Sequence, residues 1–235
     1  MMDLPILSLM TFLPLVGVLF IISVRSNDEE IVARNAKNAA LFTSFFTAAL
    51  AVYLAARFDP SNGGFQFVEK YEWFPSLGIS YHMGIDGISF FFVMLSALLV
   101  PICILASWDS IKIRVKEYMV AFLILESLMI GTFCALDSFL FYVFFEAVLI
   151  PMFIIIGIWG GPRRVYASYK FFLYTLLGSV LMLVALLTLY AQVGTSDIPT
   201  LMENPVARNL QIWLWLAVFA SFAVKMPMWP VHTWL

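Results

Sequence analysis

Long apolar runs dominate this sequence. A helix needs about 20 mostly apolar residues to cross the hydrocarbon core of a bilayer. The seven runs of that size are 4–24, 39–56, 88–107, 118–136, 138–158, 171–192 and 210–235. Because a bilayer interior offers no water to backbone N–H and C=O groups, these runs must be helices. We therefore predict an all-α polytopic membrane protein with one transmembrane domain over 1–235.

The composition agrees with this class. Of the 235 residues, 63% are hydrophobic and 12% are charged, whereas soluble domains carry about 25% charged residues. The two cysteines, Cys103 and Cys134, lie inside apolar runs and have neither metal-site nor disulfide-framework spacing. The sequence shows no nucleotide motif. We therefore expect no metal and no cofactor in this chain, and a lipid bilayer rather than nucleic acid as its surroundings.

Basic residues are concentrated in alternate connections between the runs. The connections after the first, third and fifth runs contain nine of them, namely Arg25, Arg34, Lys37, Lys112, Arg114, Lys116, Arg163, Arg164 and Lys170. The opposite connections contain Arg57, Lys70 and Arg208. Since cytoplasmic loops carry the excess of Lys and Arg, we predict that the N-terminus lies on the outer, periplasmic side.

One connection has a pattern of its own. In residues 65–86, apolar and polar side chains alternate in two stretches, "FQFVEKYEW" and "ISYHMGID", joined by "FPSLG". Period-2 alternation around a Pro/Gly turn predicts an external β-hairpin. Its simplest role is a cap that ties helices together. Glu69 is the one residue out of pattern, and His82 falls on the polar face, where we expect it to be solvated.

Three ionisable residues lie well inside the runs: Glu126, Glu146 and Lys225. A charge at mid-bilayer costs roughly 2.5–3.5 kcal/mol on insertion scales, so each needs a reason. Glu126 and Glu146 each lie eight residues from a helix end, about 12 Å at 1.5 Å per residue. Because their helices are consecutive and antiparallel, both carboxyl groups are predicted near mid-depth.

Prolines follow two of these charges. Pro227 and Pro230 come directly after Lys225, and each removes a backbone donor and disturbs the preceding turn. Irregular backbone at membrane depth is tolerated only beside protein or water, so a hydrated site is predicted there. His232 follows seven residues after Lys225, and an imidazole can exchange protons near neutral pH. Pro151 is expected to loosen the helix of Glu146 in the same way.

Two interpretations of these charges remain open. In the first, the proton affinity of Lys225 depends on its distance from Glu146, so that the pair loads a proton from one side and releases it to the other. Glu126 and His232 are then possible relay residues. In the second, Glu146 and Lys225 are a structural ion pair joining two helices. Glu126 could equally be structural, and His232 could be a hydrogen-bonded structural histidine.

Four stretches carry a resemblance to a known family. They are "YHMGIDGIS", "FFEAVLIPMFIIIGIWGG", "YKFFLYTLLGSVLML" and "FAVKMPMWPVHTWL". Together they resemble the chain M family of the proton-pumping NADH:quinone oxidoreductase (respiratory complex I), whose mitochondrial counterpart is chain 4. The resemblance implies an antiporter-like helix bundle that translocates protons, driven by electron transfer in other subunits. It also implies that Glu146 and Lys225 are the proton-handling residues.

The resemblance has consequences for partners and location. NAD, FMN, iron–sulfur clusters and quinone are expected on partner subunits, with neighbours of the chain L and N type. The expected location is the inner membrane of a bacterium or a mitochondrion. Family members are about twice as long and contain two inverted repeats, an architecture that transporters share. This sequence ends inside the first repeat, without a polar tail, so we expect a chain cut short.

Two other hypotheses compete with this one. The chain could belong to a multisubunit cation/proton antiporter, which shares the fold and the Glu/Lys pair. Co-purification with flavin and iron–sulfur subunits separates these two. It could also be a structural membrane scaffold in which the buried charges hold helices together. Replacing Glu146 with Gln while measuring both assembly and pumping separates the scaffold from the proton carrier.

Overall fold

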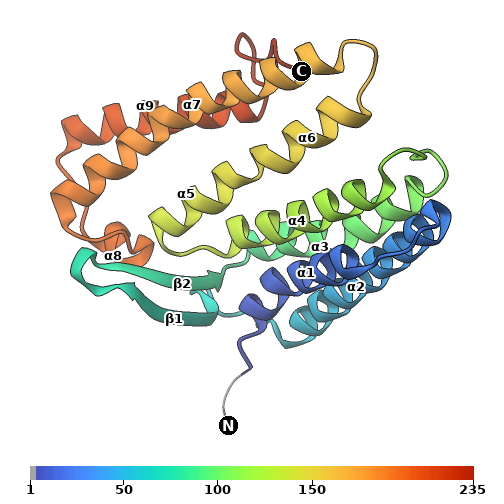
Figure 1. Ribbon diagram of the computed structural model, residues 1–235. Helices are drawn as coiled ribbons and strands as arrows, with labels where there is room; N and C mark the ends of the chain where they lie inside the picture. The colour runs from blue at the N-terminus through green and yellow to red at the C-terminus, as the bar shows by residue number, and fades with distance from the viewer. Residues whose placement is uncertain (1–3) are drawn as a thin grey trace. The chain divides into compact units, whose positions relative to one another are not determined.

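The computed structural model describes residues 4–235, so the first three residues of the predicted domain lie outside the described part. Apart from turns and connections, the described residues form helices and one two-stranded sheet (Figure 1). Packing divides it into two compact units, Met1–Glu69 with Met83–Ala135, and Lys70–His82 with Leu136–Leu235. We describe each unit by itself. That they form the single predicted transmembrane domain stays a prediction.

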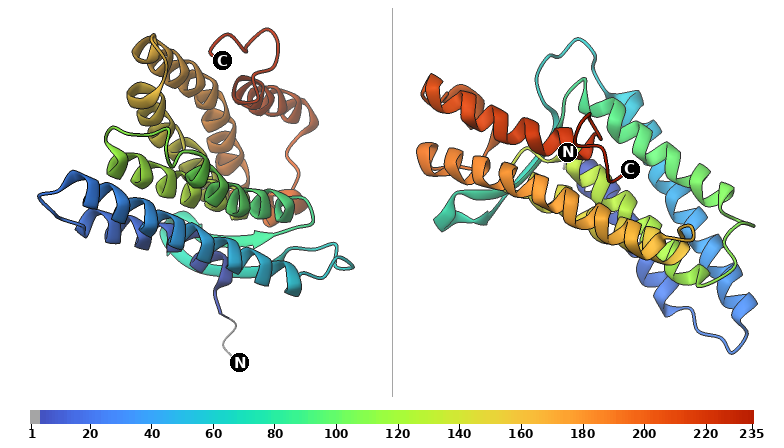
Figure 2. Two further views of the ribbon diagram at one scale, coloured as in Figure 1. Left: turned by 90° about the vertical axis from the view of Figure 1, so that its right-hand side faces the viewer. Right: turned by 90° about the horizontal axis from the view of Figure 1, so that it is seen from above.

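The first unit is a four-helix bundle. Its helices are α1 (Ile6–Ser23), α2 (Glu29–Arg57), α3 (Ser89–Ala106) and α4 (Val115–Cys134). These four helices lie side by side in the views of Figures 1 and 2. Helix α1 packs against α2 and α4, and helix α3 also packs against α2 and α4. Large apolar side chains fill its interior, among them Leu7, Met10, Ile21, Leu54, Ile104, Met119, Leu123 and Ile130. Others cover its outside, including Phe20, Phe42, Phe45 and Phe91, as expected of helices in lipid.

The second unit contains five helices. They are α5 (Ser138–Ala147), α6 (Leu149–Trp159), α7 (Arg164–Val193), α8 (Ile198–Glu203) and α9 (Arg208–Lys225). The long helix α7 packs against α9, α6 and α5. A Cβ at Gly178 of α7 would lie 2.9 Å from the Cβ of Val224 on α9. The glycine therefore permits the close approach of α7 and α9, as small residues do between membrane helices.

The predicted hairpin is present. It consists of β1 (Gln66–Phe74), a 3₁₀ turn (Pro75–Leu77) and β2 (Ile79–Ile85). Gly78 ends the turn with φ +62°, a left-handed conformation that glycine adopts without strain. The open end of the hairpin belongs to the first unit and its turn to the second.

Six described helical segments are long and apolar enough to cross a bilayer, not the seven that the sequence predicted. They are Ile6–Ser23, Glu29–Arg57, Ser89–Ala106, Val115–Cys134, Ser138–Trp159 and Arg164–Val193. Helix α9 does not qualify, because Arg208, Asn209 and Gln211 occupy its first turn. A seventh span there stays a prediction.

Several predicted boundaries were wrong. Helix α2 begins at Glu29 rather than near residue 39, because Asp28 caps it and accepts hydrogen bonds from the N–H groups of Glu30 and Ile31. Helix α7 begins at Arg164 rather than near residue 171. Hydropathy marks only the apolar part of a helix, and both helices extend into polar sequence. The short helix α8 was not predicted.

Glu69, the residue out of pattern in the hairpin, caps the first helix. Its side chain is buried, and its carboxylate accepts hydrogen bonds from the backbone N–H of Leu7 at 2.8 Å and of Ser8 at 3.1 Å. The Ser8 hydroxyl also donates to it. At the other end of α1, the Lys116 ammonium of α4 donates to the Ile22 and Val24 carbonyls, at 3.0 and 2.8 Å. Side chains of opposite charge thus satisfy the two ends of one helix.

We predict that Glu69→Ala opens the first turn of α1. Losing the capping carboxylate should reduce the protection of the Leu7 and Ser8 amides against hydrogen exchange by roughly tenfold, since a helix cap is worth about 1 kcal/mol. The measurement is hydrogen–deuterium exchange on the full-length protein in detergent. Glu72→Ala, at an exposed site in the same strand, is the control. Equal protection in both variants would show that Glu69 does not cap the helix.

A polar cluster ties the two strands of the hairpin, within residues 70–82, to two connections of the second unit. The Asp197 carboxylate accepts hydrogen bonds from Lys70 Nζ at 2.8 Å and lies 2.7 Å from His82 Nδ1. The Asp137 carboxylate accepts from the Ser80 N–H at 3.1 Å and the Ser196 hydroxyl at 2.5 Å. The expectation that His82 is solvated was wrong: the residue is only 5% exposed, and its ring is paired with Asp197, which lies 115 residues away in the sequence.

We predict that acid loosens this cluster through Asp197. Burial alone would raise the pKa of Asp197, but hydrogen bonds from Lys70, Thr200 and His82 outweigh it and hold that pKa well below the ordinary 3.8. A carboxyl with a lowered folded-state pKa stabilises the fold above its unfolded-state pKa, and this contribution is lost as the pH falls below it. Amide protection of residues 195–204 should therefore decrease below about pH 4.

Asp197→Asn supplies the comparison for this prediction. The variant should show weaker protection of residues 195–204 at neutral pH and little further loss on acidification, because the titrating group is gone. Glu203→Gln, at an exposed site in α8, should behave as the wild type. A wild-type profile that stays flat between pH 5 and about pH 3 would contradict the assignment.

Candidate functional site

The structure brings Glu146 and Lys225 together in the second unit. Glu146 lies in the last turn of α5, and Lys225 is the last residue of α9. Lys225 Nζ lies 4.0 Å from Glu146 Oε2, and the two side chains are 17% and 20% exposed. Two opposite charges, 79 residues apart in the sequence and each inside an apolar segment, thus meet in space.

Each charge also has a second partner. Lys225 Nζ donates a 2.7 Å hydrogen bond to the Phe145 carbonyl and lies 3.3 Å from the centroid of the Phe145 ring, a cation–π contact. Glu146 Oε1 accepts a 2.8 Å hydrogen bond from the Ser179 hydroxyl of α7. Glu146 Oε2 is buried and has no hydrogen-bond partner among residues 4–235. The ammonium of Lys225 and the carboxylate of Glu146 therefore each have an interaction partner besides the other.

Interrupted helices create this arrangement. Val148 separates α5 from α6, and the backbone bonds around it are long: 3.3 Å from Val148 N–H to the Phe144 carbonyl and 3.4 Å from Met152 N–H to the Val148 carbonyl. Pro151 has no N–H to donate to the last turn of α5. A carbonyl at such a helix end seeks another donor, which Lys225 supplies to Phe145.

The predicted interruption after Lys225 is confirmed. Helix α9 ends at Lys225, and residues 226–235 form turns rather than helix. The Trp234 indole N–H donates to the Val224 carbonyl at 2.8 Å, which folds this segment back onto the end of α9. The lysine is thus held at the end of a helix, beside carbonyl groups that lack their usual donors.

Buried polar atoms without partners accompany the pair. In the second unit they are Glu146 Oε2, Ser221 Oγ and His232 Nδ1. Ser221 precedes Lys225 by four residues in α9, so both lie on one face of that helix. Buried polar groups of this kind are normally satisfied by ordered water. His232, a predicted relay residue, is thus one of the residues with a buried polar atom that no described residue bonds.

Glu126 is placed in the first unit. Its side chain is fully buried in α4, and neither carboxyl oxygen has a hydrogen-bond partner among the described residues. The next residue, Ser127, donates to the Thr11 carbonyl of α1, and Thr11 Oγ1 is also buried without a partner. Because Glu126 and Glu146 belong to different units, their predicted common position near mid-depth stays a prediction.

Two members of the site were not predicted from the sequence. They are Ser179, the hydrogen-bond donor of Glu146, and the Phe145 carbonyl, the acceptor of Lys225. A serine inside the apolar stretch "LLGSVLM" was an available signal, because hydroxyls between membrane helices commonly bond across them. The Phe145 carbonyl had no signal in the side-chain pattern.

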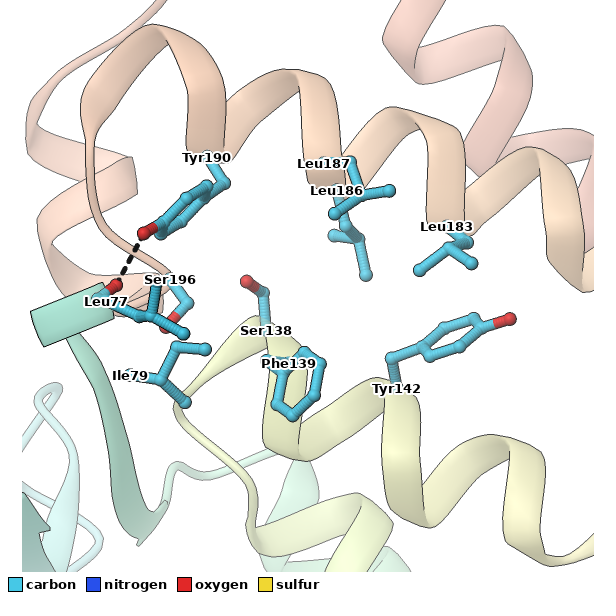
Figure 3. A pocket seen from close by; sticks show the side chains of 10 residues that line it. All are labelled: Leu77, Ile79, Ser138, Phe139, Tyr142, Leu183, Leu186, Leu187, Tyr190 and Ser196. Carbon is cyan, nitrogen blue, oxygen red and sulfur yellow. Dashed lines mark hydrogen bonds between the residues drawn. The ribbon is translucent and has the colours of Figure 1, made fainter. Parts of the chain in front are cut away.

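A separate cavity of the second unit is apolar. It measures about 210 Å³ and lies between α5, α7 and the hairpin turn, where Ile79, Phe139 and Leu183 line it (Figure 3). At one end the Tyr190 hydroxyl donates to the Leu77 carbonyl at 2.6 Å. No charged side chain is among the residues that line the cavity.

Both halves of the chain match described protein families. Residues 8–135 match "NADH-ubiquinone oxidoreductase chain 4, amino terminus", and residues 135–235 match "NADH:quinone oxidoreductase/Mrp antiporter, TM". Among relatives, NADH-quinone oxidoreductase subunit M of Rhodobacter capsulatus is 52% identical over 243 residues, covering 98% of this chain and 47% of the relative. NADH-ubiquinone oxidoreductase chain 4 of Arabidopsis thaliana is 54% identical over 196 residues, covering 83% and 40%.

Solved structures share the fold. A chain of respiratory complex I from Thermus thermophilus with bound NADH superposes with a TM-score of 0.83 at 28% identity, covering 97% of this chain and 46% of that one. A chain of the Mrp complex from Dietzia has a TM-score of 0.78 at 16% identity, covering 98% and 24%, and shows the fold alone. The chain spans about half the length of the relatives it matches. It is an integral, multi-pass membrane protein with an antiporter-like fold.

We predict that Glu126→Met leaves the fold intact or stabilises it. A buried polar group without a partner costs about 1–3 kcal/mol, and methionine has a similar size without that cost. The measurement is thermal unfolding of the full-length protein in detergent, with Glu126→Gln as a control that keeps a polar group. A drop in melting temperature for Glu126→Met alone would show that the carboxyl group has a stabilising partner.

Proposed function

The chain belongs to the NADH-quinone oxidoreductase chain 4 (subunit M) family, and from this we propose that it is a membrane-arm subunit that translocates protons. The proton carriers are Glu146 and Lys225, and electron transfer in other subunits supplies the energy. The observation that carries the proposal is the 4.0 Å separation of these two side chains at interrupted helices.

The geometry supports proton transfer better than a fixed ion pair. At 4.0 Å the ammonium and carboxylate attract each other without a direct hydrogen bond. Phe145 and Ser179 supply alternative partners, so the pair can separate without leaving either group unbonded. A change in that separation changes the proton affinity of both groups, because each stabilises the charge of the other.

Relay residues belong to the same proposal. His232 has a buried ring nitrogen without a partner, seven residues after Lys225. Glu126 has a buried carboxyl group without a partner in α4. Both groups can accept and donate protons, and ordered water is the usual link between such sites. We infer that they are relay residues, His232 in the second unit and Glu126 in the first.

The partners and location follow from the family. We infer that NAD, FMN, iron–sulfur clusters and quinone bind to other subunits, and that the neighbours include chains of the L and N type. The membrane is the inner membrane of a bacterium or a mitochondrion. The positive-inside rule supports an outer, periplasmic position for the N-terminus and for the hairpin.

The second candidate is a subunit of a cation/proton antiporter. The family description of residues 135–235 also names the Mrp antiporter, and the Mrp complex shares the fold. The 52% identity to subunit M over nearly the whole chain favours the redox-driven subunit. Co-purification with flavin-containing and iron–sulfur subunits supports the first candidate, and co-purification with antiporter subunits alone supports the second.

The deciding experiment replaces Glu146 with Gln in the full-length protein. Glutamine keeps the size and can still accept from Ser179 but cannot carry the charge. We expect normal assembly, with proton pumping reduced at least about tenfold, since positioned proton transfer contributes 10²–10⁴-fold. Assembly is measured by native electrophoresis and pumping by a fluorescent ΔpH probe in proteoliposomes.

Glu203→Gln in α8, which is exposed and distant in sequence from the pair, is the matched control. Loss of assembly in Glu146→Gln alone would support the structural-scaffold interpretation. Normal assembly with undiminished pumping would exclude Glu146 as a carrier.

A further inference from the structure

Charge is distributed unevenly along the second unit. Arg163, Arg164 and Lys170 lie where α6 ends and α7 begins. The carboxylates Asp137 and Asp197 lie beyond the opposite ends of α5 and α7, about 45 Å away along the 30 residues of α7. Glu146 is the carboxylate nearest to the basic end along the chain, thirteen residues before Trp159. The sequence contains no carboxylate side chain between Glu146 and Asp197, a stretch that includes the basic end.

The two arginines are exposed and unpaired. Neither guanidinium makes a hydrogen bond or an ion pair within residues 4–235. Lys170 donates to the Thr233 carbonyl, which leaves its charge uncompensated. Three cations within eight residues thus repel one another at the end of two membrane-spanning segments, and an anion from outside the chain would remove that repulsion.

The basic connection of the first unit is different. The groove near Lys112 is lined by carboxylates as well as cations, with Glu30 and Asp109 beside Arg34 and Lys37. Arg114 lies 3.6 Å from Glu117. A basic connection is therefore not enough to define an anion site, and the α6–α7 connection is distinguished by its lack of carboxylates.

A groove at the α6–α7 connection has two kinds of wall. The volume of this groove is about 400 Å³. Its polar side is lined by Arg163, Arg164 and Lys170, and its apolar side includes Ile156 and Trp234. The first turn of α7 carries its positive dipole end, although the Arg164 and Ala167 N–H groups already donate to the Gly161 and Arg163 carbonyls, each at 3.0 Å. Guanidinium groups bind phosphate oxygens in bidentate fashion. The site therefore combines phosphate-binding groups with an apolar surface.

We propose that Arg163, Arg164 and Lys170 form a binding site for an anionic phospholipid. The phosphate lies between the arginines at the start of α7, and an acyl chain lies along the apolar wall of the groove. The apolar wall and the position at the end of two spans favour a lipid over free phosphate. Basic pockets between membrane helices bind such headgroups. This inference depends on the spans and not on proton translocation.

Photo-crosslinking tests the proposal on the full-length protein in its membrane complex. The complex is placed in phosphatidylcholine nanodiscs containing a trace of diazirine-labelled phosphatidylglycerol, irradiated, and digested for mass spectrometry. We expect labelling of peptides within residues 156–170. Arg163→Gln/Arg164→Gln should reduce it roughly tenfold or more, because two charged contacts to the headgroup are lost. Arg163→Lys/Arg164→Lys, which keeps the charge, should retain much of it.

Matched controls give each outcome a meaning. Lys112→Gln/Arg114→Gln removes the same number of charges in the first unit and should leave the labelling of 156–170 unchanged. A diazirine-labelled phosphatidylcholine should label this segment weakly and equally in all variants. Undiminished phosphatidylglycerol labelling in the Arg163/Arg164 glutamine variant would overturn the proposal. So would equal labelling by the two lipids, or displacement of the probe by millimolar inorganic phosphate, which would assign the site to free phosphate.

Discussion

Helix ends impose the strongest constraint on this chain. In a lipid environment each unpaired backbone N–H or C=O costs several kcal/mol, and every helix leaves such groups at both ends. The structure meets this need with charged side chains from elsewhere in the sequence: Glu69 at the beginning of α1, Lys116 at its end, and Lys225 at the Phe145 carbonyl. Asp137 does the same locally at the start of α5. One of these contacts, between Lys225 and the Phe145 carbonyl, also places the lysine beside Glu146 in the candidate site.

The candidate site is a special case of the same constraint. Lys225 satisfies a carbonyl at an interrupted helix and, at the same position, faces the carboxylate of Glu146. If Lys225 served only as a hydrogen-bond donor to an unpaired backbone carbonyl, it would need no carboxylate beside it. If the ion pair served only to join two helices, neither helix would need to be interrupted there. The combination holds a charge in place while leaving it free to change partner.

Sequence periodicity predicted much of the fold but little of what connects its parts. Helices α1 and α3 and the hairpin lie where the hydropathy pattern put them, because their limits coincide with the limits of apolar sequence. The starts of α2 and α7 were missed because capping and basic residues continue a helix beyond its apolar part. The burial of His82 could not be inferred, since its partner Asp197 lies 115 residues away in the sequence. Prolines, by contrast, act locally, so the end of α9 at Lys225 was predictable.

The hydroxyl of Ser179 has one hydrogen and two acceptors within reach, Glu146 Oε1 at 2.8 Å and the Leu176 carbonyl at 2.9 Å. It cannot donate to both at once. When Glu146 is ionised, the hydrogen points to the carboxylate. If Glu146 takes up a proton, as the proposed function requires, the serine can rotate, donate to the carbonyl of its own helix, and offer a lone pair to the new acid hydrogen. Rotation about a single bond would then change the hydrogen bonding of α7 with the protonation state of Glu146, without displacement of any backbone atom.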